Sequence, residues 1–407
     1  MEDAVSFVRD AEWLTARRVR LAAVFFLFAV AAIFGTSIFP YLRQGIVLPS
    51  GESLGRDFMN YWAAARLALH GHAASAYDLH YFSEYQRAIM APDVSTRWYG
   101  YPPVTILVTL PLSMLSFVPA WALWLVVGAG LVAWVMAEEI GWTWAMVAAI
   151  ASPAFLQNAI AGQNGAFTAA LIGGGILLLQ PRPRLAGILL GLLCCKPHLA
   201  ILVPVALAAA RQWQAFLAAA MTVLILCAAS AMLFGWHAWA AFFAGMSIHR
   251  DLLENRFGMW PRMPSVYLMM RWLRVPNDVA YIGQGISAIA AAAALFFLWR
   301  KPGEMKVKGA GLMISAFLAT PYAWDYDMVM LSIAAVWLWR DACRSGWRPW
   351  EKAGLVLLIG APAVTPVLAF WAHIQLGPVI LWLVLGLIVQ RAHSAESESR
   401  RLALGTA

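Results

Sequence analysis

The sequence has 407 residues, of which 62% are hydrophobic and only 12% are charged, and its mean hydropathy is +0.69. A chain this apolar is not a water-soluble globular domain, and several of its apolar stretches approach the ~20 residues that a helix needs to cross a bilayer. The net charge of +8 is better explained by basic cytosolic loops than by nucleic-acid binding. The sequence therefore predicts one integral domain over residues 1–407, an all-α polytopic membrane helix bundle without a nucleic-acid partner.

The first predicted membrane span covers Leu21–Tyr41. Three arginines, Arg17, Arg18 and Arg20, precede it, and the bias of basic residues toward cytosolic segments places the N-terminus in the cytosol. The apolar run is longer than the 7–15 residues found in the hydrophobic region of a cleavable signal peptide. We therefore expect an uncleaved first helix.

The rest of the chain alternates apolar spans with two long polar stretches. Residues 42–103 and 235–278 are predicted to form external loops, whereas the run 104–116 is too short to span and is expected to lie on the surface or to re-enter. Further spans are predicted over residues 119–137, 142–158, 166–179, 213–234, 279–299, 309–320, 328–339, 353–371 and 376–389, before a cytosolic tail at 391–407. In all we expect about 11–13 membrane helices.

Two short apolar runs, residues 185–195 and 199–210, flank Lys196-Pro197-His198. Neither run is long enough to span alone, so they are predicted to form a broken hairpin that dips into the membrane. A charged residue at membrane depth costs at least ~2.5 kcal/mol on insertion scales and indicates a function. The ends of broken helices also leave backbone groups free, which suits an anion.

The distribution of charge supports this order of segments. If residues 104–116 do not span, most of the 29 Lys and Arg residues fall in short segments on the side of the N-terminus, as cytosolic segments should. Asp57, Gln163, Asn164 and residues 325–327 then emerge together on the external side, and Lys196 reaches toward them. This convergence predicts a site at the external face.

The cysteines do not indicate a disulfide framework or a metal centre. Cys194 and Cys195 are adjacent and, like Cys227, lie in apolar segments, and Cys343 lies in a basic loop. No group of Cys and His residues has the spacing of a zinc site. We predict no metal and no cofactor, and keep a divalent cation held by acidic residues as the weakest alternative.

Several short blocks along the chain resemble one family. They are Gly55-Arg56-Asp57-Phe58 with Tyr61-Trp62, Ala76-Tyr77-Asp78, Tyr101-Pro102-Pro103, Gly162-Gln163-Asn164-Gly165, Lys196-Pro197-His198 and Thr320-Pro321-Tyr322 with Trp324-Asp325. In their order and spacing these blocks resemble the polyprenol-phosphate-mannose-dependent mannosyltransferases, glycosyltransferase family 87, which belong to the multi-spanning C-type glycosyltransferases.

The resemblance implies an enzyme of the bacterial cytoplasmic membrane that takes a sugar from a polyprenyl-phosphate donor on the external face. It also implies that Asp57, the acid at the end of the first helix, is the catalytic base. The family tends to carry histidines just after the tryptophan of its late external turn. That turn reads Trp324-Asp325-Tyr326-Asp327 in this chain.

Such a transfer needs a base for the acceptor hydroxyl, polar groups for the leaving phosphate and a groove for the lipid tail. Asp57 at a membrane boundary suits the base in a direct displacement that inverts the anomeric carbon. Its alternative role is to cap a helix that starts near Phe58. Lys196, helped by His198, is predicted to contact the phosphate, and the alternative is that Lys196 snorkels to an interface.

Arg56 is predicted to hold Asp57 ionised or to bind phosphate. Tyr61 and Tyr101 lie near Asp57 in sequence and are predicted to stack on a sugar ring. Trp324, in the late external turn, is also predicted to contact substrate.

Four more polar residues are predicted to meet the substrate. Gln163 and Asn164 are expected to hydrogen-bond sugar hydroxyls or phosphate, or else only to close a tight turn between helices. Asp325 and Asp327 are expected to bind sugar hydroxyls, to pair with an arginine such as Arg256 or Arg262, or to stabilise the start of the next helix.

The sequence thus predicts a hexosyltransferase, mannosyl by family resemblance, that acts on a lipid or envelope-glycan acceptor and is surrounded by membrane lipids. A membrane transporter or lipid-carrier flippase of envelope precursors is the alternative, because it would also use broken helices and buried charge. A transporter usually has two matched halves, whereas this chain shows no internal repeat. A non-catalytic scaffold of an envelope complex is a third interpretation.

Overall fold

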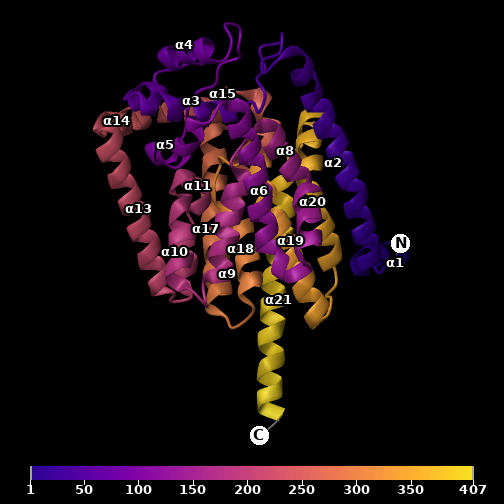
Figure 1. Ribbon diagram of the computed structural model, residues 1–407. Coiled ribbons are helices and arrows are strands. Elements are labelled where there is room, and N and C mark those ends of the chain that lie inside the picture. Colours follow the sequence, from indigo (N-terminus) through magenta and orange to yellow (C-terminus); the bar gives the residue numbers. More distant parts are fainter. Residues whose placement is uncertain (1, 406–407) are drawn as a thin grey trace.

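The computed structural model describes residues 2–405, with side chains placed for residues 5–393, and nearly all of its regular structure is helical (Figure 1). Within these residues no strand forms, and the only β-type contact is an isolated bridge between Val47 and Ser53. The predicted all-α fold is therefore confirmed.

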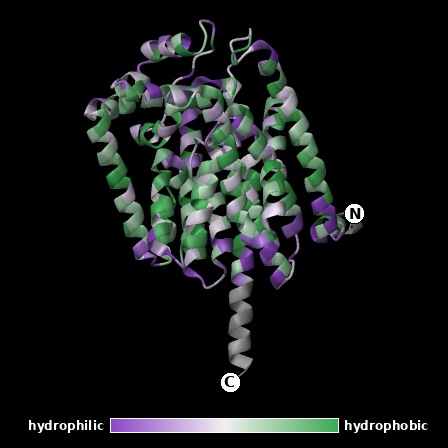
Figure 2. Ribbon diagram, viewed as in Figure 1, coloured by the Kyte–Doolittle hydropathy of each residue, from purple (hydrophilic) through white to green (hydrophobic). Residues whose placement is uncertain are grey.

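Five helices of the described chain are long and apolar enough to cross a membrane: α2 (Ala16–Gln44), α6 (Phe117–Ile140), α13 (Trp213–Phe234), α17 (Asn277–Arg300) and α20 (Glu351–Ala372). The shorter helices α9 (Gly165–Leu178), α18 (Met305–Ala319), α19 (Val329–Ser345) and α21 (Gly377–Gly405) complete the bundle. Apolar residues fill its middle, and hydrophilic residues gather at its two ends (Figure 2). The chain is a multi-pass membrane protein.

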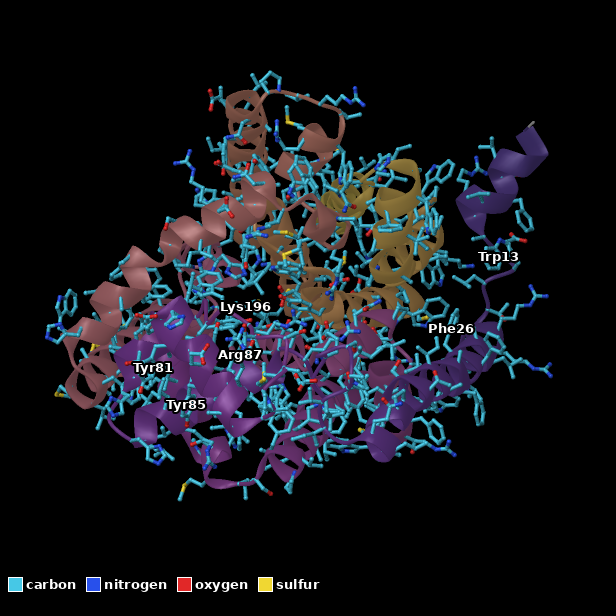
Figure 3. All side chains as sticks on the ribbon, turned by 90° about the horizontal axis from the view of Figure 1, so that it is seen from above. Trp13, Phe26, Tyr81, Tyr85, Arg87 and Lys196 are labelled. Atoms are coloured by element: carbon cyan, nitrogen blue, oxygen red, sulfur yellow. The ribbon has the colours of Figure 1, made fainter. Side chains whose placement is uncertain are left out.

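The first membrane helix is longer than predicted and lies at the edge of the bundle. It begins at Ala16 instead of Leu21 because the Thr15 side chain accepts a hydrogen bond from the Arg18 backbone N–H. A separate helix, α1 (Glu2–Asp10), precedes it. Trp13 and Phe26 lie at the periphery when the molecule is viewed from above (Figure 3), which is where lipid would surround them.

The continuous helix predicted over residues 142–158 is wrong, because the chain breaks there. Helices α7 (Trp142–Ile150) and α8 (Pro153–Ala161) are bent by 64° relative to each other. The Ser152 hydroxyl accepts a hydrogen bond from the Phe155 N–H, and Pro153 occupies the first position of α8. These two residues mark the start of a new helix. As a result, α8 runs in a different direction from α7.

The two apolar runs around Lys196 form short helices that are broken as predicted. They are α10 (Pro183–Gly191), the 3-10 turn η3 (Leu192–Cys195), α11 (Pro197–Ala200) and α12 (Val203–Ala209). Helix α10 packs on α13, and α12 packs on both α13 and α17. Lys196 stands at the turn between η3 and α11 and lies near the centre of the molecule when viewed from above (Figure 3).

The segments predicted to be external loops are largely helical. The first contains α3 (Phe58–Leu69), η1 (Ala73–Tyr77) and α4 (Leu79–Ile89), and leads into α5 (Pro103–Thr109) and η2 (Leu110–Met114); the second contains α14 (Trp236–Ala244), α15 (Met246–Asn255), η4 (Phe257–Arg262) and α16 (Val266–Trp272). Helices α3, α4, α14 and α15 gather at one end of the bundle (Figure 1). We call this end the cap. The run 104–116, as α5 and η2, packs against α3.

At the opposite end of the bundle, ion pairs to the buried Glu139 side chain connect several helices. Glu139 accepts hydrogen bonds from Lys306 and Arg344, and the Trp350 backbone N–H bonds to the carbonyl of Arg9. The basic segments that were predicted to share one side therefore lie at the end where α1 lies. Helix α21 continues through most of the predicted tail at 391–407, of which residues 406 and 407 lie outside the described part.

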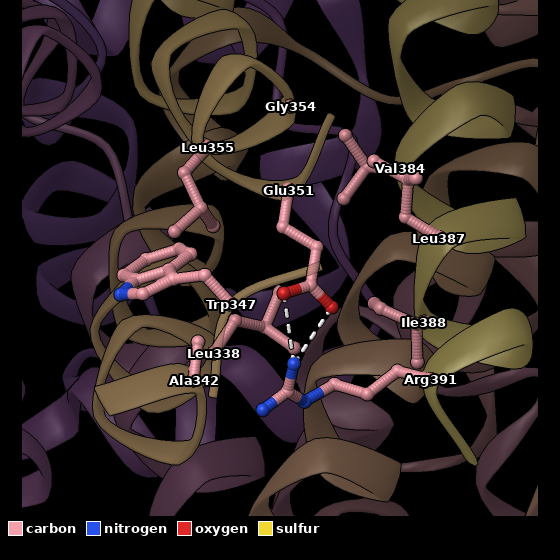
Figure 4. A pocket seen from close by; sticks show the side chains of 10 residues that line it. All are labelled: Leu338, Ala342, Trp347, Glu351, Gly354, Leu355, Val384, Leu387, Ile388 and Arg391. Atoms are coloured by element: carbon pink, nitrogen blue, oxygen red, sulfur yellow. Dashed lines mark hydrogen bonds and ion pairs between the residues drawn. The ribbon is translucent and has the colours of Figure 1, made fainter. Parts of the chain in front are cut away.

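Arg391 links α19, α20 and α21 at this end. One of its terminal N–H groups contacts both carboxylate oxygens of Glu351 at 2.7 and 2.8 Å (Figure 4), and its Nε contacts Asp341. Only 5% of the Arg391 side chain and 10% of the Glu351 side chain are exposed. The three charges therefore depend on one another, since each would otherwise be desolvated without a partner.

We expect Arg391→Ala to destabilise the protein by about 3–5 kcal/mol, because it leaves two buried carboxylates without their cation. The loss is measured as a lower Tm in detergent. Arg300→Ala is the matched control, because Arg300 is exposed and only lies over the Phe296 ring. Equal melting temperatures for Arg391→Ala and wild type would contradict this account.

Candidate active site

A tight turn between α8 and α9 organises the polar groups at the cap end. Gly162 has a φ of +64°, and a Cβ at this position would collide with the carbonyl oxygen of Gly55. A Cβ at Gly165 would collide with the carbonyl oxygen of Tyr326. The two glycines thus let the turn pack directly against backbone of two distant segments. Gln163 and Asn164 stand between those segments as a result.

Asp57 precedes α3 but does not cap it. Its side chain accepts no hydrogen bond from the first turn of the helix, so the capping alternative is wrong. Instead, Oδ2 accepts a hydrogen bond of 2.9 Å from the Gln163 amide, and Oδ1 lies 3.5 Å from Nε of Arg97. The side chain is 28% exposed, so this carboxylate is oriented by the protein and still open to solvent.

The Gln163 amide is itself oriented by two phenols. Tyr61 and Tyr101 donate hydrogen bonds of 2.8 and 2.9 Å to its Oε1. Burial raises the pKa of both tyrosines, so each keeps its proton and acts as a donor. With Oε1 committed to the phenols, the amide N–H points to the carboxylate. Tyr61 is fully enclosed and therefore acts through Gln163, whereas Tyr101 is half-buried.

Lys196 forms a buried ion pair on the other side of the turn. Its ammonium donates to Asp327 Oδ1 at 2.5 Å and to Asn164 Oδ1 at 2.9 Å, and it lies 4.9 Å from the centre of the Tyr326 ring. The Lys196 side chain is 2% exposed and that of Asp327 is fully buried. Lys196 does not snorkel to an interface, since its ammonium is held inside the protein by two hydrogen bonds and a neighbouring ring.

Asp325 is paired with one of the two arginines that the sequence suggested. Nε and Nη2 of Arg262 each donate to a different oxygen of Asp325, both at 2.9 Å, which is the strong bidentate geometry. Arg256 instead lies 3.6 Å from Asp251. The Arg262 side chain is 33% exposed, and its guanidinium lies over the rings of Trp324 and Tyr326.

Arg97 is a site residue that sequence reasoning missed. It bridges Glu52 at 2.8 Å and Asp57 at 3.5 Å, and Gln86 clamps its backbone by hydrogen bonds to both its N–H and its carbonyl. No spacing in the sequence connects Arg97 to Asp57. The one feature that pointed to Arg97 was its position just before the Tyr101-Pro102-Pro103 block. Arg56, which was predicted to hold Asp57, is exposed and lies 3.9 Å from Glu52.

The His198 side chain contacts the ring of Tyr322. Its imidazole packs edge to face on Tyr322 at a centroid distance of 5.5 Å. In the described residues no group of three or more His, Cys, Asp or Glu side chains is arranged to hold a metal ion. Asp325 and Asp327 do not join Asp57 as a set of ligands, because each faces its own cation.

A model of Glycosyltransferase family 87 matches residues 98–321, a little over half of the chain. No curated protein and no solved structure matches significantly. The matched region contains the Gly162–Gly165 turn and Lys196, whereas Asp57 precedes it and residues 324–327 follow it. The chain belongs to glycosyltransferase family 87 and is a glycosyltransferase.

Gly162→Ala is expected to displace the turn from Gly55 and so to misplace Gln163 and Asp57. Overpacking of this kind, with a strained φ, costs about 1–3 kcal/mol. We expect a lower Tm in detergent together with a loss of at least about 10-fold in transferase activity, because small displacements of positioned groups are costly. The control is Gly130→Ala, since no atom lies within 4 Å of a Cβ at Gly130. Full activity in Gly162→Ala would contradict the proposed function of the turn.

Proposed function

We propose that this glycosyltransferase moves a hexosyl group from a polyprenyl-phosphate donor to a hydroxyl of a lipid or envelope-glycan acceptor on the external face of the bacterial cytoplasmic membrane, and that mannose is the first donor sugar to test. The single observation that carries the proposal is the state of Asp57. This carboxylate caps no helix, is partly exposed, and is held by Gln163 and Arg97 at the cap end of a membrane bundle.

In the proposed reaction, Asp57 takes the proton of the acceptor hydroxyl. The acceptor oxygen forms a bond to the anomeric carbon as the bond from that carbon to the phosphate oxygen breaks, and polyprenyl phosphate leaves. A retaining mechanism would need a second free carboxylate as nucleophile. Asp325 and Asp327 are at most 2% exposed and are paired with cations, and the partly exposed Glu52 is paired with Arg97 at 2.8 Å. This favours a single displacement with inversion, in which Asp57 is the base.

The exposure of Lys196 and Arg262 indicates which of these two cations is free to contact the leaving phosphate. The Lys196 ammonium is engaged by Asp327 and Asn164, so we assign it to positioning, where it holds the turn against the late segment. Arg262 is 33% exposed and uses two of its five N–H donors on Asp325. We propose that its remaining donors meet the leaving phosphate. Asp57 interacts electrostatically with Lys196 and with Arg262, as expected for one site.

An apolar cavity supports a binding site for the lipid tail of the donor. An apolar cavity of about 250 Å³ lies between the broken hairpin and α13. Its lining includes Leu190, Cys194, Pro197, Leu207, Phe216 and Val223. Pro197, which belongs to this lining, directly follows Lys196 in the sequence. Since α13 is only slightly buried within the protein, the cavity lies next to the lipid. We propose that the polyprenyl chain enters here.

Asp57→Asn is expected to lower kcat at least about 100-fold, because an amide cannot accept the proton of the acceptor hydroxyl. The assay follows release of polyprenyl phosphate and labelling of a product from radiolabelled polyprenyl-phosphate mannose, with an extract of envelope lipids as acceptor. Asp93→Asn is the control, since Asp93 is an exposed cap acid. Normal transfer by a folded Asp57→Asn variant would remove the proposed base. If wild type uses only another sugar donor, the mannosyl assignment is replaced.

Val223→Trp is expected to fill the apolar cavity and to raise KM for a long-chain polyprenyl donor by about 10-fold, as the loss of buried apolar contact predicts. A donor with a chain of only two isoprene units should be unaffected, because it does not extend along the cavity. Leu224→Trp is the matched control, since Leu224 is the next residue of α13 and is 62% exposed. Equal changes in KM for both chain lengths would place the lipid elsewhere.

A further inference from the structure

Five rings from four separate segments form a continuous cluster at the cap end, apart from the Asp57–Gln163 contacts. The members of this ring cluster are Trp98, His198, His249, Tyr322 and Trp324. Neighbouring rings lie 4.2 Å (Trp98–His249), 5.2 Å (His249–Tyr322), 5.5 Å (His198–Tyr322) and 5.9 Å (Tyr322–Trp324) apart. Trp98 precedes α5, His198 follows the hairpin turn, His249 lies on α15, and the last two precede η5.

The ring cluster holds four buried polar atoms without a hydrogen-bond partner in the protein. They are Nε1 of Trp98, Nε2 of His198, Nδ1 of His249 and Nε1 of Trp324. Trp324 is only 8% exposed. A buried donor or acceptor that stays unpaired carries its full desolvation cost, and such atoms are rare in proteins. Four of them lie along this one chain of rings, where the polar groups of a ligand would satisfy them.

The ring cluster adjoins the site through residues 98–101. A Cβ at Gly100 would lie 2.8 Å from the Trp98 ring and 2.9 Å from Nε2 of His249, so glycine is required for the two rings to meet. The next residue, Tyr101, donates to the Gln163 amide that holds Asp57. On its other side, Trp324 lies under the guanidinium of Arg262. The ring cluster therefore has a neighbour of the proposed base at one end and the proposed phosphate contact at the other.

The polar atoms of the ring cluster are uncharged. Burial lowers the pKa of His249 to about 4, so its imidazole is neutral near pH 7 and can accept a hydrogen bond. The two indoles can only donate. An anionic ligand would pair with the cations Arg262 and Arg97 and not with the uncharged ring cluster. Hydroxyl groups both donate and accept, and aromatic rings offer apolar faces to carbon-bound hydrogens. A sugar ring combines these two kinds of surface.

We propose that the ring cluster binds an uncharged pyranose ring, with Trp98 and Trp324 donating to its hydroxyls and His198 and His249 accepting from them. The proposal rests on the proposed function, since it names the sugar-recognising part of the same site. The bound pyranose is either the hexose of the donor or a sugar of the acceptor, since both present the same hydroxyl groups and ring faces. Trp98 and His249 become specificity residues that the family match alone did not identify.

Binding is measured first, without turnover. Methyl α-D-mannopyranoside is titrated into purified full-length protein in detergent, and its saturation-transfer NMR signal is followed. We expect His249→Leu to weaken binding at least 10-fold and Trp98→Phe, which keeps the ring and loses the N–H, to weaken it less. His249→Asn keeps an acceptor near the Nδ1 position and should retain part of the affinity. His237→Ala, at an exposed histidine of the cap, should bind like wild type.

Steady-state kinetics then separate the two sources of the ring. A higher KM for the polyprenyl-phosphate hexose, with kcat little changed, assigns the ring cluster to the donor sugar, whereas a higher KM for the acceptor assigns it to the acceptor sugar. Either result supports the proposal. Unchanged sugar binding and unchanged KM in folded His249→Leu and Trp98→Phe variants overturn it, as does equal weakening by His237→Ala.

The two proposals fail in different ways. If Asp57→Asn abolishes transfer while ring variants bind and turn over normally, the proposed function stands and the ring cluster is not a sugar site. If wild type transfers from no polyprenyl-phosphate donor but the ring variants lose pyranose binding, the ring cluster stands and the proposed donor class is wrong. The Tm of each variant in detergent checks that it is folded.

Discussion

The close approach of three backbone segments at the turn between α8 and α9 is the constraint on which the site depends. Gly162 lets the turn contact the carbonyl of Gly55, and Gly165 lets it contact the carbonyl of Tyr326. Any larger side chain at either position would separate segments that lie about 100 and 160 residues away in sequence. Since Gln163 faces Asp57 and Asn164 faces Lys196, one turn sets the distances on both sides of the site.

Charge in the site is compensated in pairs, and this decides which groups are left for substrate. Lys196 is matched with Asp327 in a fully buried pair, and Arg262 with Asp325 in a bidentate pair that is open on the arginine side. A buried pair is costly to break because each partner would remain desolvated. The groups that stay partly exposed are therefore Asp57, with Glu52 beside it on Arg97, and the edges of the guanidinium groups. The reaction proposed above, between a phosphate-linked sugar and a hydroxyl acceptor, uses that combination.

Much of the fold was predictable because the membrane allows few alternatives. Long apolar runs must be helices, and Pro197 directly after Lys196 favours a break because proline cannot continue a helix. The break at Ser152-Pro153 was also readable, since a capping hydroxyl before a proline marks a helix start, but the continuous apolar pattern around it suggested one span. Arg97 and His249 could not be predicted in the same way. Their roles arise from contacts with residues far away in sequence, which no local pattern reports.

The same limit applies to sugar recognition. In the family that the sequence resembles, histidines tend to follow the tryptophan of the late turn, and here aspartates stand in their place. Both aspartates are used to pair with Lys196 and Arg262, so they are not substitutes for the missing imidazoles. Two imidazoles nevertheless stand beside Tyr322 in that turn, because His198 comes from the broken hairpin and His249 from α15. Under the proposed role of the ring cluster, the sugar is therefore selected by rings that the fold brings together from several segments, and not by the residue types of one turn.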